Sequence, residues 1–381
     1  MSIRLKIASA VVLIAGFSLA GLSAGPVAAH TGVRAASAPK GTVAFLGPEE
    51  FTGRWVKDAA DFDKELKKLD PKAKILDYNA NADIQTQTQQ ADAAEAAGAK
   101  VLIVAAVDQF GDVPIVNQAI SKGLKVLAYD RMIQTPKLKA YDSFDNEGVG
   151  VLQGTWFKAN VPKGQIVEIL GSATDHNEAL FDAGFQKEVG PLVKSGKYTV
   201  CYSTTTPNWD PPTAGTEMND AFTKCGTNIA GVYSMNDGMA ADVYTSIKDN
   251  APSAKIPLTG QDAQPDGLGR ILLGEQGMTV FKNVKYEADA AAEFAYYALA
   301  KKGLPKEYKN GGKDCEQINA SLAYDGHQVK CALFTPEAIT LKNVADPVNA
   351  GFDTWATTAA GIGVCPSVGL TNTSPYCGLP H

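Results

Sequence analysis

The chain has 381 residues, of which 45% are hydrophobic and 20% charged, and its formal net charge is −6. This length is enough for two domains with separate cores. Lysines and arginines are dispersed along an acidic chain, which disfavours a strongly basic surface, so we expect no nucleic acid among its partners.

The first 29 residues have the layout of a secretory signal peptide. Arg4 and Lys6 precede an apolar stretch that begins at Ile7, and small residues follow up to Ala29. The stretch is short and rich in glycine and alanine, which disfavours the alternative of an uncleaved membrane anchor. We predict that residues 1–29 are removed on export to the periplasm or cell surface and that residues 30–40 are a flexible leader. No cysteine precedes Cys201, so we expect no lipid-anchor cysteine.

From residue 41 onward, short apolar segments alternate with amphipathic segments. Strands are expected over residues 41–46, 74–78, 101–106 and 125–129, and helices over 54–69, 84–97 and 112–122. The pattern restarts after residue 146, with strands over 165–170, 198–203, 229–234, 256–260 and 278–281 and helices over 177–190, 212–224, 239–249, 265–274 and 286–302. Strand-like pieces recur near 321–324 and 329–334. This alternation predicts an α/β protein with two doubly wound parallel-sheet lobes.

The strand expected over 125–129 ends in Asp130 and Arg131. Strands of an open α/β sheet deliver side chains from their carboxyl ends to a ligand crevice. We therefore expect Arg131 to face such a crevice. The following Phe144-Asp-Asn146 is expected to carry the chain from one sheet to the other.

Six cysteines fall in the second half of the chain as three sequence-local pairs. In an oxidising compartment they favour three structural disulfides, Cys201 with Cys225, Cys315 with Cys331 and Cys365 with Cys377, although other pairings stay open. No C-x-x-C pair occurs and the chain has only four histidines, so we expect no metal site.

Five short motifs occur in order: Tyr129-Asp-Arg131, Ser143-Phe-Asp-Asn146, Gly171-Ser…Asp175-His-Asn177, Asn236-Asp237 and Gly260-Gln-Asp-Ala263. With them the chain resembles the periplasmic sugar-binding proteins of ABC importers, over residues 42–340. Within that family the likeness is greatest to the D-xylose-binding and multiple-sugar-binding members. The cysteines and the tail over 345–381 depart from the family pattern, and their role stays open.

The resemblance implies a type I periplasmic binding protein fold, with two lobes joined by three hinge strands. By that analogy the N-terminal lobe comprises residues 41–145 and 263–304, and the C-terminal lobe comprises 146–262 and 305–344. Outside the resemblance, we expect the tail over 345–381 to be pinned by its cysteines, Cys365 and Cys377. The hinge residues would be Asp145, Asn146 and Asp262, with a third hinge in the last third of the chain.

The resemblance also implies a set of ligand-binding residues suited to sugars, with charged planar groups for hydroxyls and aromatic rings for the C–H faces. They are Arg54, Trp55, Arg131, Asp175, Asn177, Trp209, Asn236, Asp262 and Lys282. Structural alternatives remain for them. Trp55 can pack between helix and sheet, Arg131 can pair with Asp130, Asn236 can cap a helix and Asp262 can close a turn. Asp130 is expected to be structural, and His176 departs from the family motif.

The function implied is that of an exported, monomeric receptor that closes its lobes on a monosaccharide and delivers it to the membrane subunits of an ABC importer. D-Xylose is the first expectation, with glucose or another aldose as alternatives. A sensor that presents the sugar to a chemoreceptor or kinase is a second hypothesis. No nucleophile, base and oxyanion-stabilising group can be assembled from the sequence, so we expect no catalytic residues, no cofactor and no enzymatic activity; an enzyme on the same fold is the remaining alternative.

Overall fold

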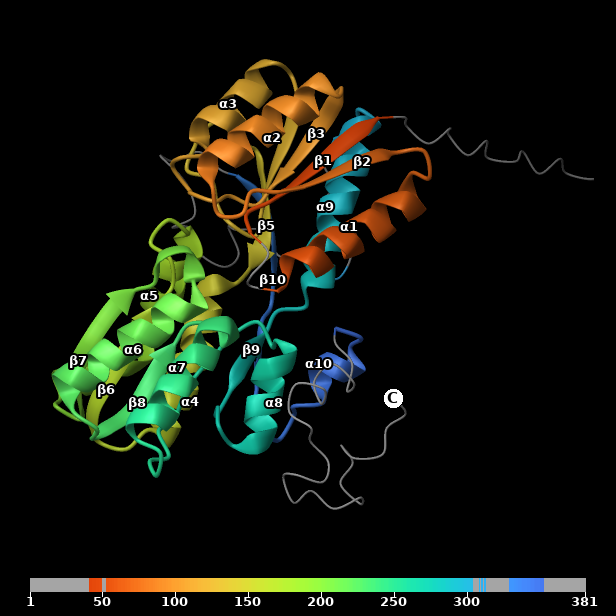
Figure 1. The fold of residues 1–381 in the computed structure, drawn as a ribbon. Helices are drawn as coiled ribbons and strands as arrows, with labels where there is room; N and C mark the ends of the chain where they lie inside the picture. Colours follow the sequence, from red (N-terminus) through yellow and green to blue (C-terminus); the bar gives the residue numbers. More distant parts are fainter. Residues whose placement is uncertain are drawn as a thin grey trace, which may run out of the picture. The chain divides into compact units, whose positions relative to one another are not determined.

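The computed structural model describes residues 41–49, 53–303, 308, 310, 312 and 329–352. Strands and helices alternate through most of these residues (Figure 1). Within them, no helix combines the length and the apolar character needed to span a bilayer. The predicted signal peptide, the leader, the strand-like piece near 321–324 and the tail beyond residue 352 lie outside the described residues.

A six-stranded, all-parallel sheet forms what we call the first lobe. In sheet order its strands are β10 (Lys330–Phe334), β5 (Ala140–Phe144), β4 (Lys125–Tyr129), β3 (Ala99–Val104), β1 (Thr42–Gly47) and β2 (Lys74–Asn79). Its helices are α1 (Trp55–Leu69), α2 (Ile84–Ala96), α3 (Val113–Ser121) and α9 (Val284–Leu299).

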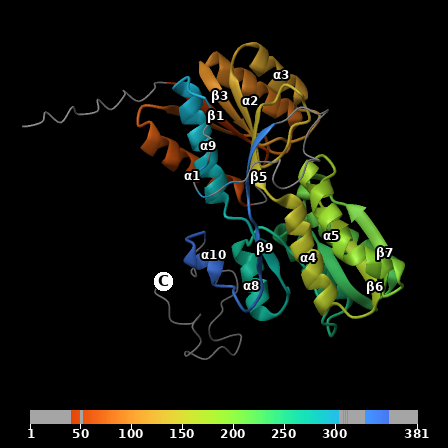
Figure 2. The same ribbon diagram turned by 180° about the vertical axis from the view of Figure 1, so that it is seen from behind.

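Both faces of this sheet are covered because successive side chains of a strand point to opposite sides. On β1, Val43 and Phe45 pack in one cluster with α1 and α9. Ala44 and Leu46 pack in another cluster with α2 and α3. Figure 2 shows the two helix pairs on either side of the sheet. Burial on both faces explains why β1 reads as a continuous apolar run in the sequence.

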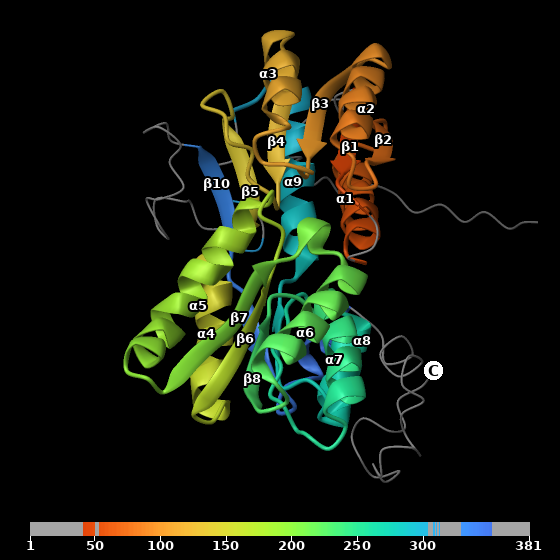
Figure 3. The same ribbon diagram turned by 60° about the vertical axis from the view of Figure 1, so that its left-hand side comes forward.

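A three-stranded parallel sheet forms the core of the second lobe, in the order β7-β6-β8. Its elements are α4 (Asn146–Asn160), β6 (Gly164–Leu170), α5 (His176–Lys194), β7 (Tyr198–Thr205), the 3₁₀ turn η1 (Pro207–Trp209), α6 (Pro211–Cys225), β8 (Ile229–Ser234) and α7 (Asp237–Asn250). Figure 3 shows α4 and α5 on one side of the sheet and α6 and α7 on the other. Helices α4 and α5 approach closely, since a Cβ on Gly150 would lie 1.9 Å from the Phe181 carbonyl oxygen.

The last part of the second lobe is built from segments that are distant in the sequence. Strand β9 (Thr279–Phe281) pairs antiparallel with β11 (Glu337–Ile339), beside α8 (Pro265–Leu273) and α10 (Asp346–Asn349). Met278 and Val280 pack into the same apolar cluster as the three-stranded sheet. Residues up to 281 therefore belong with the second lobe, whereas α9, which begins at Val284, packs on the first.

The predicted lobe boundaries differ from the structure in two places. Residues 263–281 were expected in the N-terminal lobe, but Met278 and Val280 pack in the second-lobe cluster and Ala263, Leu268, Ile271 and Phe281 pack with Ile339 of β11. Since α9 begins at Val284, the chain crosses at 282–283 rather than at Asp262. Residues 305–344 were expected in the C-terminal lobe, but β10 pairs with β5 in the first-lobe sheet. Near the expected first crossing, Asp145 donates its backbone N–H to the carbonyl oxygen of Phe334. The chain crosses a third time between β10, in the first-lobe sheet, and β11, which pairs with β9 in the second lobe.

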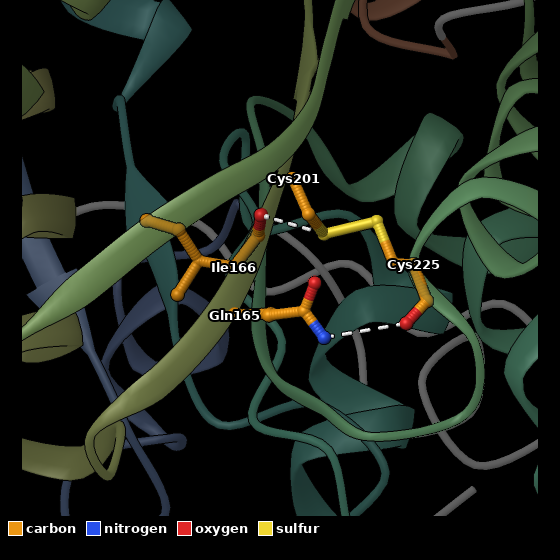
Figure 4. Close-up of a disulfide and its surroundings, with 4 residues drawn as sticks. All are labelled: Gln165, Ile166, Cys201 and Cys225. Atoms are coloured by element: carbon orange, nitrogen blue, oxygen red, sulfur yellow. Dashed lines mark hydrogen bonds between the residues drawn. A yellow bond between two sulfur atoms is a disulfide. The ribbon is translucent and has the colours of Figure 1, made fainter.

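One predicted disulfide is present, between Cys201 on β7 and Cys225 at the end of α6, with the Cα atoms 5.8 Å apart. Figure 4 shows it beside β6, where Gln165 donates a side-chain hydrogen bond to the Cys225 carbonyl oxygen at 3.3 Å. Cys331 is also disulfide-bonded. Cys315, Cys365 and Cys377 lie outside the described residues, so the other two pairings stay predictions.

Most predicted elements are present with small shifts of their ends. The structure adds β5, α4, β11 and α10, which were not predicted. The expected strand over 256–260 is reduced to a single bridge between Val232 and Leu258. Helix α4 was missed because it carries Gly148, Gly150 and Gly154, which disfavour a helix in isolation.

Candidate functional site

A cavity of about 300 Å³, including its mouth, is lined by residues of both lobes. Its lining consists of Arg54, Trp55, Asp130, Arg131, Asp175, Asn177, Phe181, Trp209, Asn236, Gln261, Asp262 and Lys282. All nine residues that the family resemblance implied are therefore brought together. Whether each contacts a ligand stays a prediction. Asp130, expected to be structural, also lines the cavity, and sequence reasoning missed Phe181 and Gln261.

The first-lobe wall is built around the guanidinium of Arg54, at the start of α1. Arg54 donates to Asp130 Oδ1 at 2.7 Å, to Asp58 Oδ1 at 2.8 Å and to Glu287 Oε2 at 2.8 Å. Burial opposes the charge of Arg54, but these three carboxylates outweigh it and raise its pKa. Burial likewise works against ionised Asp130, but Arg54, Lys282 and Arg131 overcome it and lower the pKa of this carboxyl. Arg54 was predicted as a hydroxyl donor, yet most of its N–H groups serve these acids.

Trp55 and Arg131 lie together in the same wall. The Arg131 guanidinium carbon is 5.1 Å from the centre of the Trp55 ring. The indole N–H of Trp55 donates to Glu49 Oε1 at 2.6 Å, and Arg131 Nη2 donates to the same atom at 3.1 Å. Arg131 Nη1 donates to the Ala106 carbonyl oxygen at 3.3 Å. A flat apolar surface is thus held next to a guanidinium, as recognition of a hydroxylated ring requires.

The second-lobe wall consists of polar residues that also cap helices. Asp175 caps α5 by accepting from the Asn177 backbone N–H at 2.9 Å, and Asn236 caps α7 by accepting from the Met239 N–H at 2.8 Å. Each cap follows the carboxyl end of a strand, which is why both reach the cavity. The capping role considered for Asn236 is therefore present, together with its place in the lining. Burial raises the pKa of Asp175, and Arg131 counteracts this.

Three lining residues have left-handed backbone conformations, which non-glycine residues rarely adopt. They are Asp130 with φ 57°, Trp209 with φ 60° and Asp262 with φ 90°. Trp209 is accommodated because Gly171 has no side chain: a Cβ there would lie 1.9 Å from the indole. Backbone strain of this kind concentrates at functional sites.

The charges of the lining balance. It contains three cationic side chains, Arg54, Arg131 and Lys282, and three carboxylates, Asp130, Asp175 and Asp262. Lys282 Nζ lies 3.2 Å from Asp262 Oδ1 and 3.8 Å from Asp130 Oδ1, and Arg131 Nε lies 3.0 Å from Asp175 Oδ2. An internally neutralised lining favours an uncharged ligand over an ion.

Four buried polar atoms of the lining have no hydrogen-bond partner in the part of the chain that the structure describes. They are Arg131 Nε, Trp209 Nε1, Gln261 Oε1 and Asp262 Oδ1. Arg131 Nε and Asp262 Oδ1 have ionic neighbours within range, but these contacts are not aligned as hydrogen bonds. Buried polar groups are nearly always hydrogen-bonded in proteins. The set contains donors and acceptors, which matches hydroxyl groups because each hydroxyl can donate and accept.

Hydrogen bonds also join the two lobes beside the cavity. Gln109 donates its backbone N–H to the Thr174 carbonyl oxygen at 2.9 Å, and Thr174 Oγ1 donates to the Val107 carbonyl oxygen at 3.3 Å. Asn177 Nδ2 donates to both the carbonyl and a carboxylate oxygen of Asp130, each at 3.2 Å. The lobes are therefore in direct contact around the cavity.

Sequence reasoning missed the residues that support the lining from behind, namely Glu49, Asp58 and Glu287. Asp58 follows Arg54 by four residues on α1, which is a readable ion-pair spacing. Glu287 lies 233 residues from Arg54 in the sequence, so no local signal marks their contact. Gln261 could have been predicted from the sequence, because it stands between Gly260 and Asp262 in one of the five motifs.

Comparison with known proteins gives consistent matches. The D-xylose-binding periplasmic protein of Escherichia coli (strain K12) is 34% identical over 297 residues, covering 77% of this chain and 85% of that protein. The multiple sugar-binding periplasmic protein SbpA of Azospirillum brasilense is 32% identical over 319 residues, covering 78% of this chain and 89% of that protein.

Solved structures support the same fold. An ABC transporter solute-binding protein from Clostridium phytofermentans with bound β-D-glucose superposes with a TM-score of 0.74 at 24% identity, covering 83% of this chain and 99% of that one. The family model described as a periplasmic binding protein domain matches residues 43–303. The predicted α/β fold of the type I periplasmic binding proteins is thereby confirmed, and the chain belongs to the periplasmic binding protein domain family.

Proposed function

We propose that this protein is an exported receptor that binds one neutral monosaccharide in the cavity between its lobes and delivers it to the membrane subunits of an ABC importer. D-Xylose is the first candidate ligand, since relatives named for D-xylose cover most of the chain. Glucose is the next, because a relative named for multiple sugars and a structural neighbour with bound glucose also match. The protein acts as a receptor and not as an enzyme.

One observation carries this proposal: a charge-balanced lining contains donors and acceptors that have no hydrogen-bond partner among the described residues, beside aromatic rings from both lobes. A sugar ring would place its apolar faces against Trp55 and Trp209 and its hydroxyls within reach of Arg131, Gln261 and Asp262. A charged ligand would disturb the cation–carboxylate pairs of the lining, Arg54–Asp130, Arg131–Asp175 and Lys282–Asp262. A sugar that lacks one of the hydroxyls bonded by the lining would leave a buried polar group of the protein without a hydrogen bond, and it should bind more weakly.

Hinge closure is the proposed mechanism of capture. The contacts between the loop at Gln109 and the loop at Thr174 support a closed arrangement in which the two walls meet. A bound ligand contacts both walls at once, so ligand binding shifts the equilibrium between open and closed forms toward the closed form. Export fits the predicted signal peptide, and N-terminal sequencing of the secreted protein would test removal of residues 1–29.

Isothermal titration calorimetry of the mature protein against a panel of pentoses and hexoses tests the proposal. We expect saturable heat with one site per chain, strongest for an aldose. Trp55→Ala and Arg131→Ala should each lower the affinity about tenfold or more, because each removes a desolvated contact. A folded protein that gives no heat with any monosaccharide would defeat the proposed function. A variant whose affinity stays within about threefold of the unmodified protein identifies a residue that does not contact the sugar.

A further inference from the structure

Glu49 is a buried carboxylate immediately behind the cavity. It lies just beyond the carboxyl end of β1, is 1% exposed and is not part of the cavity lining. Its Oε1 atom accepts two hydrogen bonds, from the indole N–H of Trp55 at 2.6 Å and from Arg131 Nη2 at 3.1 Å. One oxygen therefore holds the two lining residues to which we assign the sugar face and the sugar hydroxyls.

Trp55 and Arg131 come from separate parts of the first lobe, the start of α1 and the loop after β4. Their relative position is not fixed by a shared element. The packing of the guanidinium over the indole, at 5.1 Å, allows sliding because it has no directional hydrogen bond. The shared bonds to Glu49 supply that direction, since hydrogen bonds to a carboxylate are short and angularly restricted.

We infer that Glu49 is a positioning residue that sets the sugar selectivity of the cavity by fixing the register between the Trp55 ring and the Arg131 guanidinium. The inference rests on the proposed function and deepens it. Stacking fixes where the sugar ring lies, and the guanidinium then tests which hydroxyls lie at the right place on that ring. When Glu49 fixes the ring and the guanidinium relative to each other, the cavity discriminates between epimers. When the two groups can move relative to each other, the cavity binds several sugars with more similar affinities.

Removing the Glu49 side chain would leave two buried donors without this acceptor. The Arg131 guanidinium would keep its contacts to the Ala106 carbonyl oxygen and to Asp175, which lie on other sides of it. The indole of Trp55 would lose its one hydrogen bond recorded among the described residues. The two groups would then be able to move relative to each other while both remain in the lining.

The test compares Glu49→Ala and Glu49→Gln with a matched buried glutamate, Glu168→Gln, in the second lobe. Glu168 is 5% exposed and accepts from Gln186 Nε2 at 3.1 Å, away from the cavity lining. Dissociation constants are measured by calorimetry for the preferred sugar and for its best competitor. We expect Glu49→Ala to weaken the preferred sugar at least about tenfold and the competitor less than about threefold, so that selectivity shrinks. Glu49→Gln keeps an acceptor oxygen for the indole and should retain most of the selectivity, and Glu168→Gln should leave both constants unchanged.

A second arm asks whether Glu49 acts through Trp55. Trp55→Phe keeps an aromatic face but has no N–H, so its effect and that of Glu49→Ala should be strongly non-additive in a double-mutant cycle. The ¹H–¹⁵N signal of the Trp55 indole, identified by its loss in Trp55→Phe, should shift in Glu49→Ala with no sugar present.

The possible outcomes are distinct. Unchanged selectivity in Glu49→Ala, a loss equal for every sugar, or additive effects with Trp55→Phe would each overturn the inference while sugar binding itself stands. An unmodified protein that binds no sugar would overturn the proposed function and the selectivity role with it, even where the indole signal still shifts.

Discussion

The two walls of the cavity hold their polar side chains by different means. In the first lobe, Arg54 is fixed by carboxylates that come from three separate segments, Asp58, Asp130 and Glu287. In the second lobe, Asp175 and Asn236 are fixed by the first turn of the helix that each begins. The first arrangement is a buried, non-local ion network, and the second is a repeated local cap. Mutations in the first wall should therefore destabilise the protein by leaving buried charges without a counter-charge. Mutations in the second wall should cost only the stability of a single helix cap.

The largest effect is expected from breaking the network of the first wall. Arg54→Met would leave three buried carboxylates without their shared cation, and the free energy of unfolding should fall by about 3–5 kcal/mol. Urea unfolding followed by circular dichroism measures this. Lys68→Met is the control, because Lys68 pairs with Glu65 but is 54% exposed, and it should cost less than about 1 kcal/mol. Similar losses in the two variants would contradict the contrast between the walls.

The second-largest effect is expected from removing the disulfide of the second lobe. Cys201 and Cys225 are 24 residues apart, and a double replacement by serine should lower the free energy of unfolding by about 3 kcal/mol. Neither cysteine lines the cavity, so sugar affinity should stay within about twofold at a temperature where the protein remains folded. Thermal unfolding and calorimetry on the same samples measure both quantities. A large affinity loss in the folded variant would mean that the bridge shapes the site.

Loss of a single cap should have a smaller effect. Asn236→Ala and Asp210→Ala each remove an N-cap, from α7 and α6 respectively, and each should cost about 1 kcal/mol of stability. Only Asn236 lines the cavity, so only its replacement should also weaken sugar binding. The pair therefore separates capping from ligand contact. Equal affinities in the two variants would remove Asn236 from the proposed binding set.

The smallest expected effect concerns Asp142 on β5, behind the first wall. It is 1% exposed and neither carboxylate oxygen has a hydrogen-bond partner among the described residues. Burial, with nearby Asp130 and Asp58, raises its pKa well above the usual range. The folded protein thus holds this proton more tightly than the unfolded chain. The resulting stabilisation is complete below the unfolded pKa of about 4 and is lost as the pH rises through the raised folded pKa.

Asp142→Asn should therefore change the stability near neutral pH by less than about 1 kcal/mol, because the amide resembles the protonated acid. It should also reduce the decline in stability as the pH rises. Unfolding midpoints measured from roughly pH 5 to pH 8 test this, with the exposed Asp249→Asn as control. A steeper decline in Asp142→Asn than in the unmodified protein would show that the carboxylate is ionised in the fold.

The second wall was easier to predict than the first for a physical reason. A helix cap joins residues only two or three positions apart, after the end of a strand. The short motifs at Asp175 and Asn236 therefore contain both partners of the capping hydrogen bond. The contact of Glu287 with Arg54 depends on α9 packing beside α1 after the chain has passed through the other lobe. The second crossing was placed wrongly near Asp262 because motif spacing does not reveal that Met278 and Val280 pack in the second-lobe core. Strand β5 was missed because Ala140–Phe144 includes the buried Asp142.

The contact between Gln109 and Thr174 uses main-chain atoms on at least one side of every bond. Its strength therefore depends little on which side chains line the cavity, unlike the bonds that Asn177 donates to Asp130. This part of the closing energy can thus be changed separately from selectivity. We expect Thr174→Val, which removes the bond to the Val107 carbonyl oxygen, to lower the affinity for every sugar by the same factor, as calorimetry across the panel would register. A pocket redesigned for another polyol would then keep this part of the closing energy, which makes this scaffold suited to a set of sugar reporters with a related conformational response.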